Sequence, residues 1–250
     1  CPKFQIMLSL FKSKPKLAEL IPSGYVDIHS HVLPGIDDGA QKIKDSEFLL
    51  ESMIDFGFSK VITTPHTMKN VWDNTTSSID DAYNLVHSEL PELSKQVSLQ
   101  FASEYFLDEN LIRLAQQEKL LSLKDNFILI EMSYLNAPIQ LYDFLFELQL
   151  KGYQLVLAHP ERYNYFHSNK KEYQKLKKAG CLFQLNLLST VGYYGKEVAE
   201  TANYLLKENL YDFTGSDIHH KNHIKAFQSK IIFNNDTKIM GVMKKNTFFL

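Results

Sequence analysis

The stretch of sequence that decides the fold is YVDIHSH at residues 25–31, and PGIDDG follows it at residues 34–39. Apolar and polar residues alternate at its start, which predicts a β-strand. His29 and His31 are two residues apart, so their side chains point to the same face of that strand. At a strand end, two such imidazoles are a natural pair of metal ligands. The alternative is a pair of strand-end histidines that are hydrogen-bonded to loops.

Composition and charge limit the class of protein. The chain has 250 residues, of which 44% are hydrophobic, and this suffices for one large domain or two small ones. A net charge of −2 argues against a basic face for nucleic acid. The only cysteines are Cys1 and Cys181, so we expect no disulfide framework. We find no apolar run of about 18 residues and no secretory signal. We therefore expect a cytoplasmic protein without a membrane span.

The beginning of the chain is unusual. It starts with Cys1, whereas MLSLFK at residues 7–12 has the character of a natural start. We expect residues 1–6 to be foreign to the natural protein or misnumbered, and a lipoprotein cysteine at position 1 is the alternative. Residues 1–24 are expected to form a leader that packs on the outside of the domain. No linker divides residues 25–250, so we expect them to form a single domain.

Strand-like and helix-like segments alternate along the rest of the chain. Strands are predicted at residues 25–31, 60–64, 97–102, 127–130, 155–158, 182–185 and 211–214. Helices are predicted at residues 45–56, 77–90, 109–117, 138–151, 169–178 and 196–207. Such alternation is typical of an α/β fold with a parallel sheet. A closed (β/α) barrel and an open doubly wound sheet both satisfy it, but the glycine-rich nucleotide fingerprints of open sheets are absent.

Residues of the types that bind metals follow almost every predicted strand. They are His29, His31, His66, Glu104, Glu131, His159, Asp217 and His219. In a barrel the carboxyl ends of the strands converge on one face, so these side chains are expected to meet there. Any one of them alone is explained as an ordinary polar strand end, but the repetition predicts a shared metal site.

The ligand types indicate what this site holds. Imidazoles combined with carboxylates suit zinc, manganese, iron or cobalt better than calcium or magnesium alone, and about nine ligands are enough for two or three ions. Clustered ions lower the pKa of a bound water and clamp an oxyanion substrate. The sequence therefore favours a metal-dependent hydrolase.

Arginine is rare in this lysine-rich chain, and Arg113 and Arg162 are the only two. An arginine in such a chain suggests a bidentate contact with a phosphate or a carboxylate that lysine would not make. Arg162 lies just after His159, so we predict that it binds a phosphoryl oxygen of the substrate. The alternative is a salt bridge with Glu161 or with a helix carboxylate.

Two other classes of hydrolase are disfavoured. A cysteine-based phosphatase requires an arginine shortly after its cysteine, and no arginine lies near Cys181. Cys181 is therefore interpreted as a small core residue. The Gly-x-Ser-x-Gly elbow of serine hydrolases is also absent. Of the remaining histidines, His87 is predicted to be structural, whereas His167, His220 and His223 lie close to the site loops.

Four short motifs together resemble the polymerase and histidinol phosphatase (PHP) superfamily. They are DIHSH with LPGIDDGA at residues 27–40, TTPH at residues 63–66, AHPERY at residues 158–163 and GSDIH at residues 215–219. More closely, they resemble the bacterial tyrosine phosphatases that are encoded with capsule and exopolysaccharide genes. The resemblance extends from residue 25 to the C-terminus, and the combination of motifs is specific.

The resemblance implies a fold and an activity. The fold is α/β, a distorted (β/α)7 barrel of the PHP type that resembles a TIM barrel. It holds two to three divalent ions, manganese first, with zinc, iron or cobalt as alternatives. The implied activity is hydrolysis of phosphotyrosine on the tail of a bacterial tyrosine kinase, which regulates capsular or exopolysaccharide synthesis. Peripheral contact with a membrane kinase follows from that substrate.

The resemblance also assigns roles to individual residues. The implied metal ligands are His29, His31, Asp38, His66, Glu104, Glu131, His159, Asp217 and His219. Asp38 is preferred to Asp37 because it directly precedes the glycine, and the two glutamates match by strand position only. Arg162, His159 and Asp217 are the implied catalytic residues, with Arg162 as the phosphate clamp. We expect a metal-bridging hydroxide to attack phosphorus in line, without a covalent phosphoenzyme.

Three other functions remain open on the same residues. The first is a phosphatase for histidinol phosphate or another small phosphomonoester. The second is an amidohydrolase, although such enzymes often have a lysine where this chain has Glu131. The third is a non-catalytic scaffold, which should have lost ligands. The loops at 68–76 and 187–195 lie outside the motifs and do not predict substrate preference.

Aromatic residues cluster after the fifth and sixth predicted strands. They are Tyr163, Tyr165, Phe166, Tyr193 and Tyr194. One hypothesis is a rim that stacks a substrate ring. The alternative is ordinary packing at the mouth of a barrel.

Overall fold

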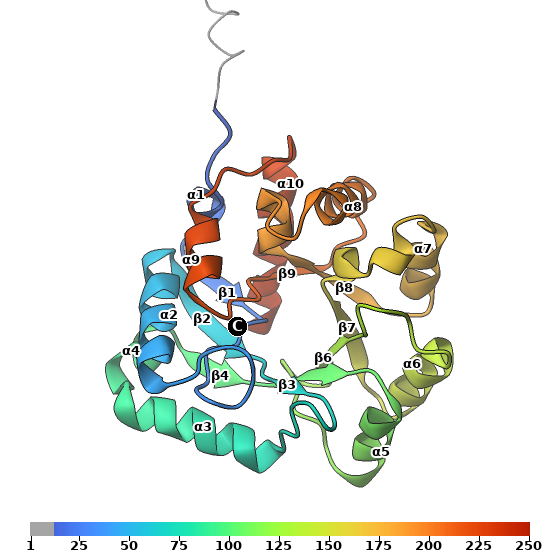
Figure 1. The fold of residues 1–250 in the computed structure, drawn as a ribbon, viewed down its shortest axis with the longest axis horizontal. Coiled ribbons are helices and arrows are strands. Elements are labelled where there is room, and N and C mark those ends of the chain that lie inside the picture. Colours follow the sequence, from blue (N-terminus) through green and yellow to red (C-terminus); the bar gives the residue numbers. More distant parts are fainter. Residues whose placement is uncertain (1–12) are drawn as a thin grey trace, which may run out of the picture.

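The computed structural model describes residues 13–250, so the expectation for residues 1–6 lies outside the described part of the chain. Helices surround the strands in a mixed α/β structure (Figure 1). The strands are β1 Tyr25–Asp27, β2 Phe58–Thr63, β3 His66–Thr67, β4 Leu99–Phe101, β5 Glu104–Phe106, β6 Phe127–Glu131, β7 Gln154–Ala158, β8 Leu182–Asn186 and β9 Phe213–Gly215.

The helices follow the strands in the chain and lie around them. The α-helices are α1 Leu17–Leu20, α2 Ile43–Asp55, α3 Thr76–Glu89, α4 Pro91–Gln96, α5 Glu109–Gln117, α6 Leu141–Leu150, α7 Lys171–Lys178, α8 Lys196–Lys207, α9 Lys221–Phe227 and α10 Asp236–Lys245. The 3-10 helices are η2 Pro160–Arg162, η3 Asn164–Phe166, η4 Leu187–Val191 and η5 Asn246–Phe249. No helix in the described range has both the length and the apolar character that crossing a membrane requires.

The strands form two parallel sheets. One has three strands in the order β1-β2-β4, and the other has six in the order β3-β5-β6-β7-β8-β9. Every paired neighbour in both sheets is parallel. The predicted α/β class with parallel sheets is therefore confirmed.

The two sheets are joined at both borders, by the continuous chain at one and by backbone hydrogen bonds at the other. At one border the chain bends from β2 into β3 and from β4 into β5, and Ala102 N donates to Thr63 O over 2.8 Å. At the other border Ser30 pairs with Ile218 just beyond β1 and β9. There His31 N donates to Ile218 O over 2.9 Å. These junctions bring the carboxyl ends of strands from both sheets to one face of the molecule.

Apolar side chains are buried on both faces of the central strands. Leu129 of β6 and Val156 of β7 belong to an inner cluster, which also contains Phe249 from η5. Their neighbours Ile128 and Leu155 belong to an outer cluster beneath the helices. The continuous apolar runs are thus explained, because both faces of these strands are covered.

The predicted strand boundaries need correction at two bends. The segment predicted at 60–64 is β2, but the chain bends at Pro65 and continues as β3. The segment predicted at 97–102 contains β4, and Glu104 opens β5 rather than ending the strand. Neither bend has a clear local signal, because extended residues continue on both sides. The short helix α4 was also not predicted, since only Leu90 separates it from α3.

Part of the expected leader is built into the fold. Leu17 and Leu20 of α1 are buried. Leu17 N donates to Ser229 O, and Ile231 N donates to Pro15 O, each over 3.0 Å. Residues 13–24 therefore pack against the segment that follows α9.

Candidate metal centre

The structure brings all of the predicted metal-binding side chains together. They form four overlapping groups, which are His31, Asp38, His66 and His219; His29, His31 and Glu104; His29, His159 and Asp217; and His66, Glu104 and Glu131. Asp38 lies in the loop between β1 and α2, and each of the others lies at or just beyond the carboxyl end of a strand, or at the start of β3 or β5. The members of each group have ligand atoms within 4.8 Å of one another.

Glu104 lies at the middle of this centre and is almost fully buried. Its Oε2 is 3.1 Å from His29 Nε2 and 3.2 Å from His66 Nδ1. Its other oxygen, Oε1, is 3.2 Å from His159 Nε2. One carboxylate thus faces three imidazoles that come from three different strands.

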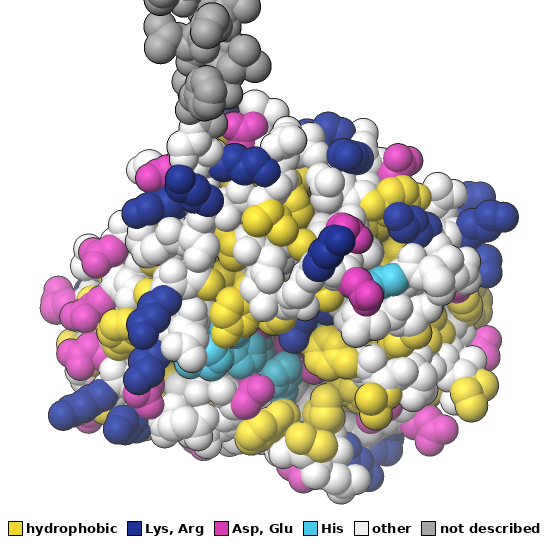
Figure 2. Space-filling model, turned by 45° about the horizontal axis from the view of Figure 1, so that its top comes forward, with side chains coloured by type: hydrophobic (Ala, Val, Ile, Leu, Met, Phe, Trp, Pro, Cys, Tyr) yellow, Lys and Arg dark blue, Asp and Glu magenta, His cyan; other side chains and the backbone are white. Residues whose placement is uncertain are grey.

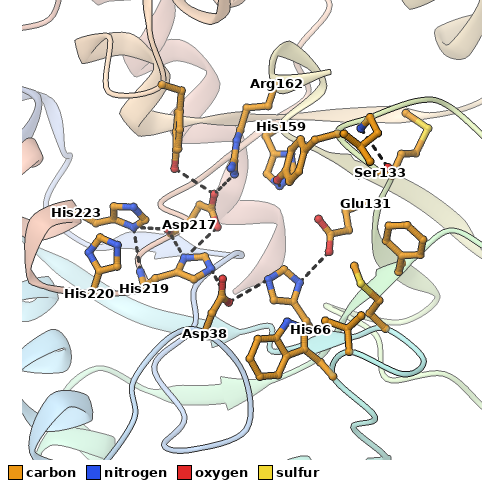
Figure 3. Close-up of a pocket in the computed structure, with 18 residues that line it drawn as sticks. Asp38, His66, Glu131, Ser133, His159, Arg162, Asp217, His219, His220 and His223 are labelled. Atoms are coloured by element: carbon orange, nitrogen blue, oxygen red, sulfur yellow. Dashed lines mark hydrogen bonds and ion pairs between the residues drawn. The ribbon is translucent and has the colours of Figure 1, made fainter. Parts of the chain in front are cut away.

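Asp38 lies on the outer side of the centre. Its Oδ1 is 3.4 Å from His66 Nε2 and 3.4 Å from His219 Nε2 (Figure 3). The Asp38 side chain is 56% exposed, whereas Glu104 and Asp217 are buried. The centre therefore extends from a buried inner part to an outer part that opens to solvent.

Close backbone approaches set the position of the ligand-bearing loops. A Cβ atom on Gly39 would lie 2.2 Å from His31 O, and one on Gly215 would lie 2.6 Å from His29 Cβ. Only glycine avoids these overlaps. The loop that contains Gly39 and the loop that contains Gly215 therefore lie in close contact with the residues that follow β1.

Several buried polar atoms of the centre have no hydrogen-bond partner. They are His29 Nε2, His31 Nε2, His66 Nδ1 and both carboxylate oxygens of Glu104. Some lie close to an opposite charge, but their angles do not make hydrogen bonds. Unpartnered buried groups are costly. Lone pairs of imidazole and carboxylate atoms around a shared space are what divalent metal ions require, so the donor set fits such ions.

The charges in the centre reinforce one another. Burial raises the pKa of Glu104, but His29 and His66 outweigh it and hold that pKa well below its usual range. Burial lowers the pKa of His29, but Glu104 and Asp217 outweigh it and raise that pKa well above its ordinary value. Carboxylates that attract protons onto these nitrogens also attract divalent cations, which compete for the same atoms.

Two further side chains orient the histidines of the first motif. Asp37 Oδ2 accepts a hydrogen bond from His31 Nδ1 over 2.8 Å. Gln184 Oε1 accepts one from His29 Nδ1 over 2.9 Å. Such bonds fix the tautomer and leave Nε2 free to bind a metal. The preference for Asp38 over Asp37 agrees with this geometry, whereas Gln184 was missed because it lies inside a predicted strand.

Arg162 is held at the inner wall of the cleft. Its Nη1 donates to Asp217 Oδ2 over 2.8 Å. Its guanidinium lies between two aromatic rings, 4.7 Å from the centroid of Tyr134 and 4.2 Å from that of Tyr194. The alternative of a salt bridge to Glu161 is wrong, because Glu161 bonds instead to Asn186 N.

The predicted aromatic rim is only partly correct. Tyr163 and Phe166 are buried in the outer core, so they cannot stack on a substrate. Tyr194 does line the cleft. Tyr134 also lines the cleft, where its hydroxyl lies 3.4 Å from His159 Nε2. It was not predicted from the sequence. Tyr134 follows β6 without any distinctive motif, so only the fold reveals it.

The remaining histidines fall into two sets. His220 and His223 line the cleft. Burial lowers the pKa of His223 to about 3, so it is neutral near pH 7. His167 lies farther back, where its Nε2 donates to Glu161 O over 2.7 Å. His87 lies on α3 against Tyr83, as expected of a structural histidine.

The centre forms the floor of a cleft of about 640 Å³. Figure 2 shows the histidines in a hollow on one face of the molecule, bordered by hydrophobic side chains. No cysteine is among the lining residues of this cleft. Cys181 is instead buried in the outer core, as predicted.

Comparisons with known proteins agree with one another. Residues 25–232 match the family described as capsular polysaccharide synthesis, CpsB/CapC. The tyrosine-protein phosphatase YwqE of Bacillus subtilis is 30% identical over 195 residues, which cover 78% of this chain and 77% of that protein. The tyrosine-protein phosphatase CpsB of Streptococcus agalactiae is 26% identical over 200 residues, which cover 78% and 82%.

A solved structure is similar as well. It belongs to the crystal structures of YwqE from Bacillus subtilis and CpsB from Streptococcus pneumoniae, described as unique metal-dependent tyrosine phosphatases. The TM-score is 0.74 at 29% sequence identity, and the match covers 81% of this chain and 84% of that one.

Proposed function

This chain belongs to the CpsB/CapC family of capsular polysaccharide synthesis, and from that premise we propose that it is a metal-dependent protein-tyrosine phosphatase. The observation that carries the proposal is that five histidines and four carboxylates cluster at the floor of one cleft, which Arg162 also lines. Hydrolysis of a phosphomonoester requires several positive charges around the phosphoryl oxygens, and metal ions bound here together with Arg162 would supply them.

The ligand set that we propose for the metals is the one described above. Two to three divalent ions, manganese first, would be held by His29, His31, Asp38, His66, Glu104, Glu131, His159, Asp217 and His219. When bound, such ions supply positive charge for the phosphoryl oxygens and acidify an attacking water. Four residues belong to two groups each, which supports shared ligands; they are His29, His31, His66 and Glu104.

Arg162 is the residue that we assign to the phosphoryl group. Arginine carries five N–H donors, and Arg162 uses one of them in its hydrogen bond to Asp217. The flanking rings of Tyr134 and Tyr194 hold the guanidinium plane, so its other donors are preorganised for phosphoryl oxygens. With His159 and Asp217 in contact with the same space, these three residues form the proposed catalytic set.

The leaving group makes a modest demand on the protein. Tyrosine phenolate has a pKa of about 10, so its departure needs little proton donation. A cysteine nucleophile is not needed, and none lines the cleft. The step that we propose is a direct attack of water on phosphorus, in which the bond to the phenolate oxygen breaks.

The fold that we assign is the distorted (β/α)7 barrel of the PHP type, as a single domain from residue 25 onward. Taking β2 with β3 and β4 with β5 as two bent strands leaves seven strands around the inner cluster. The pairing of Ser30 with Ile218 links the first of them to the last.

The substrate that we assign is the phosphotyrosine tail of a bacterial tyrosine kinase in the cytoplasm. Hydrolysis there would regulate capsular or exopolysaccharide synthesis, with peripheral contact to a membrane kinase. The open outer side of the centre at Asp38 suits a polypeptide better than a small enclosed ligand. Histidinol phosphate is therefore the competitor in the test and not a second proposal.

The experiment is phosphate release from a phosphotyrosine peptide and from histidinol phosphate. The enzyme is stripped with a chelator and then given manganese, zinc, iron or magnesium in turn. We expect metal-dependent release from the peptide, lost in His159→Ala and Arg162→Ala and retained in the control His87→Ala. Release mainly from histidinol phosphate would support the metal site but contradict the assigned phosphotyrosine substrate. No release under any metal would overturn the proposal.

A further inference from the structure

A second hollow lies beside the metal cleft. Its volume is about 610 Å³, and it shares Phe106 and Ser133 with the cleft. It is lined by the turn after β3, by the start of α5 and by the loop between β6 and α6. The two hollows therefore adjoin at Phe106 and Ser133, so a polypeptide whose side chain occupies the cleft would have its neighbouring residues beside the second hollow.

Exposed apolar side chains line both of the adjoining hollows. Ile139, which lines the second hollow, is fully exposed, and Leu135, which lines the cleft, is 87% exposed. Val71 on the opposite loop is 59% exposed. Large apolar side chains that gather in this way mark a surface that a partner covers. Figure 2 shows hydrophobic side chains around the histidine-lined hollow.

Two cations of the second hollow have no ion pair among the described residues. They are Lys69 and Arg113, the second of the two arginines in the chain. The Arg113 guanidinium donates to two neutral amides, Asn110 Oδ1 over 2.6 Å and Gln117 Oε1 over 2.8 Å. It therefore retains its charge and further donors for a carboxylate.

Acidic residues also line this hollow, and they limit where a carboxylate can dock. Asp108 Oδ1 is engaged as the cap of α5, because it accepts from Leu111 N over 2.9 Å. Glu109 lies in the first turn of the same helix and is exposed. Arg113 is one helical turn farther on and donates to Asn110 and Gln117, not to Glu109, so it is the cation on α5 that can pair with an incoming acidic side chain.

From these observations we infer that the second hollow is the docking groove for the substrate polypeptide beside its phosphotyrosine. The occupant is a segment with an apolar side chain, which covers Leu135 and Ile139, and an acidic side chain, which pairs with Arg113. The inference rests on the proposed function, because the phosphotyrosine itself occupies the metal cleft. It places the preference for particular sequences outside the metal centre.

The test compares two kinds of substrate on the metal-loaded enzyme. One is p-nitrophenyl phosphate, which has no flanking residues, and the other is a phosphotyrosine peptide with glutamate and leucine within four residues on either side. The variants are Arg113→Gln and Ile139→Ser. The matched controls are Lys171→Gln and Leu150→Ser, which replace an exposed lysine and an exposed leucine outside both hollows.

We expect each groove variant to raise KM for the peptide about fivefold to tenfold, as loss of one interface contact does. Turnover of p-nitrophenyl phosphate should stay within about twofold, because that substrate reaches only the cleft. Replacing the glutamate of the peptide by alanine should remove the effect of Arg113→Gln, as a double-mutant cycle requires.

The outcomes separate the two proposals. If the wild-type enzyme hydrolyses neither substrate, the proposed function fails. If it hydrolyses both and the groove variants leave the peptide constants unchanged, the docking groove is wrong. Equal losses on both substrates would also overturn it, since they would show that the variants disturb the cleft itself.

Discussion

Arg162 combines an ion pair with two aromatic contacts, and this combination is specific to arginine. Lysine at this position keeps the charge but loses the planar fork and the stacking on Tyr134 and Tyr194. We expect Arg162→Lys to lower kcat/KM for p-nitrophenyl phosphate by about 100-fold, the usual cost of one lost transition-state donor. Steady-state kinetics at saturating manganese measures this, with bound metal determined in parallel. A variant within threefold of the wild type would contradict the assigned role.

Asp37 and Asp38 are neighbours in the sequence, but the structure gives them different tasks. Asp37 accepts a hydrogen bond from His31 Nδ1, whereas Asp38 faces the Nε2 atoms of His66 and His219. We expect Asp37→Asn to weaken metal affinity about 10-fold to 100-fold without changing the number of bound ions. Asp38→Asn should instead reduce that number. Competition with a chromophoric chelator measures both quantities, and identical behaviour of the two variants would refute this division.

The sequence predicts the residues that end apolar runs, and it fails for those that act through contacts distant in the chain. His66 and His159 could be predicted because each lies within a short motif at the end of a predicted strand. Gln184 was not, because it contacts His29 across 155 positions. Nor does the sequence reveal that His159 and Asp217 have left-handed backbones, with φ of 33° and 51°. Non-glycine residues adopt that conformation uncommonly, and here it occurs in two residues of the candidate site as well as in turns such as those at Asn70 and Asn209.

At the scale of elements, the short η2 helix depends on one buried carboxylate. Glu161 accepts from Asn186 N over 2.9 Å, from Ser189 Oγ over 2.8 Å and from Tyr211 Oη over 2.9 Å. These bonds tie η2, which carries Arg162, to β8 and to the segments around it. The turn that presents Arg162 is therefore anchored from behind.

Removing this anchor should cost stability. Glu161→Ala leaves three buried donors unpartnered, so we expect it to lower the free energy of unfolding by about 3 kcal/mol. Glu161→Gln should cost less than half of that, because burial already raises the pKa of the carboxyl to about 7 and an amide retains an acceptor. Urea unfolding of both variants measures the difference. Equal losses in the two would show that the side chain fills space and does not anchor the turn.

The α/β class and the parallel pairing followed from the alternation of apolar runs with helical patterns, but the bends did not. At Pro65 and again between β4 and β5, the chain stays extended while its hydrogen-bonding partners change. Periodicity reports which face is buried, not which neighbour a strand pairs with. The division into two sheets is therefore a property of pairing, which a single sequence does not express.

At the scale of the whole molecule, the metal centre joins both sheets. His29 and His31 follow β1 of the smaller sheet, whereas Glu104, Glu131 and His159 come from the larger one. Bound ions should therefore stabilise the entire fold and not a single loop.

Chelation should lower the melting temperature. Ions at 100 times their dissociation constant add about 2.7 kcal/mol, which corresponds to a shift of about 5–10 °C for a chain of this size. Calorimetry of the stripped protein before and after addition of manganese measures it. The shift should be much smaller in His66→Ala, and an unchanged melting temperature in the wild type would argue against binding by this centre.

Cys181 reports on global unfolding. It is 1% exposed, and burial raises the pKa of its thiol to about 12. A buried thiol of this kind reacts only when the structure opens. In a Cys1→Ser background, we expect no alkylation by iodoacetamide under native conditions and full alkylation at the urea midpoint and above. Rapid labelling without urea would reveal local opening near the start of β8.

The pairing of β1 with the far end of the chain has a consequence for how the protein is made. Ser30 pairs with Ile218, and the Asn246 side chain donates to Val26 O and to Thr214 O. During synthesis β1 leaves the ribosome long before residues 214–246 have been made. Until then, the edge of β1 that faces these residues has no hydrogen-bonding partner. The candidate metal centre is therefore completed only when Asp217 and His219 have been added, and we expect a chain interrupted before residue 217 to have most of the proposed ligands but no phosphatase activity.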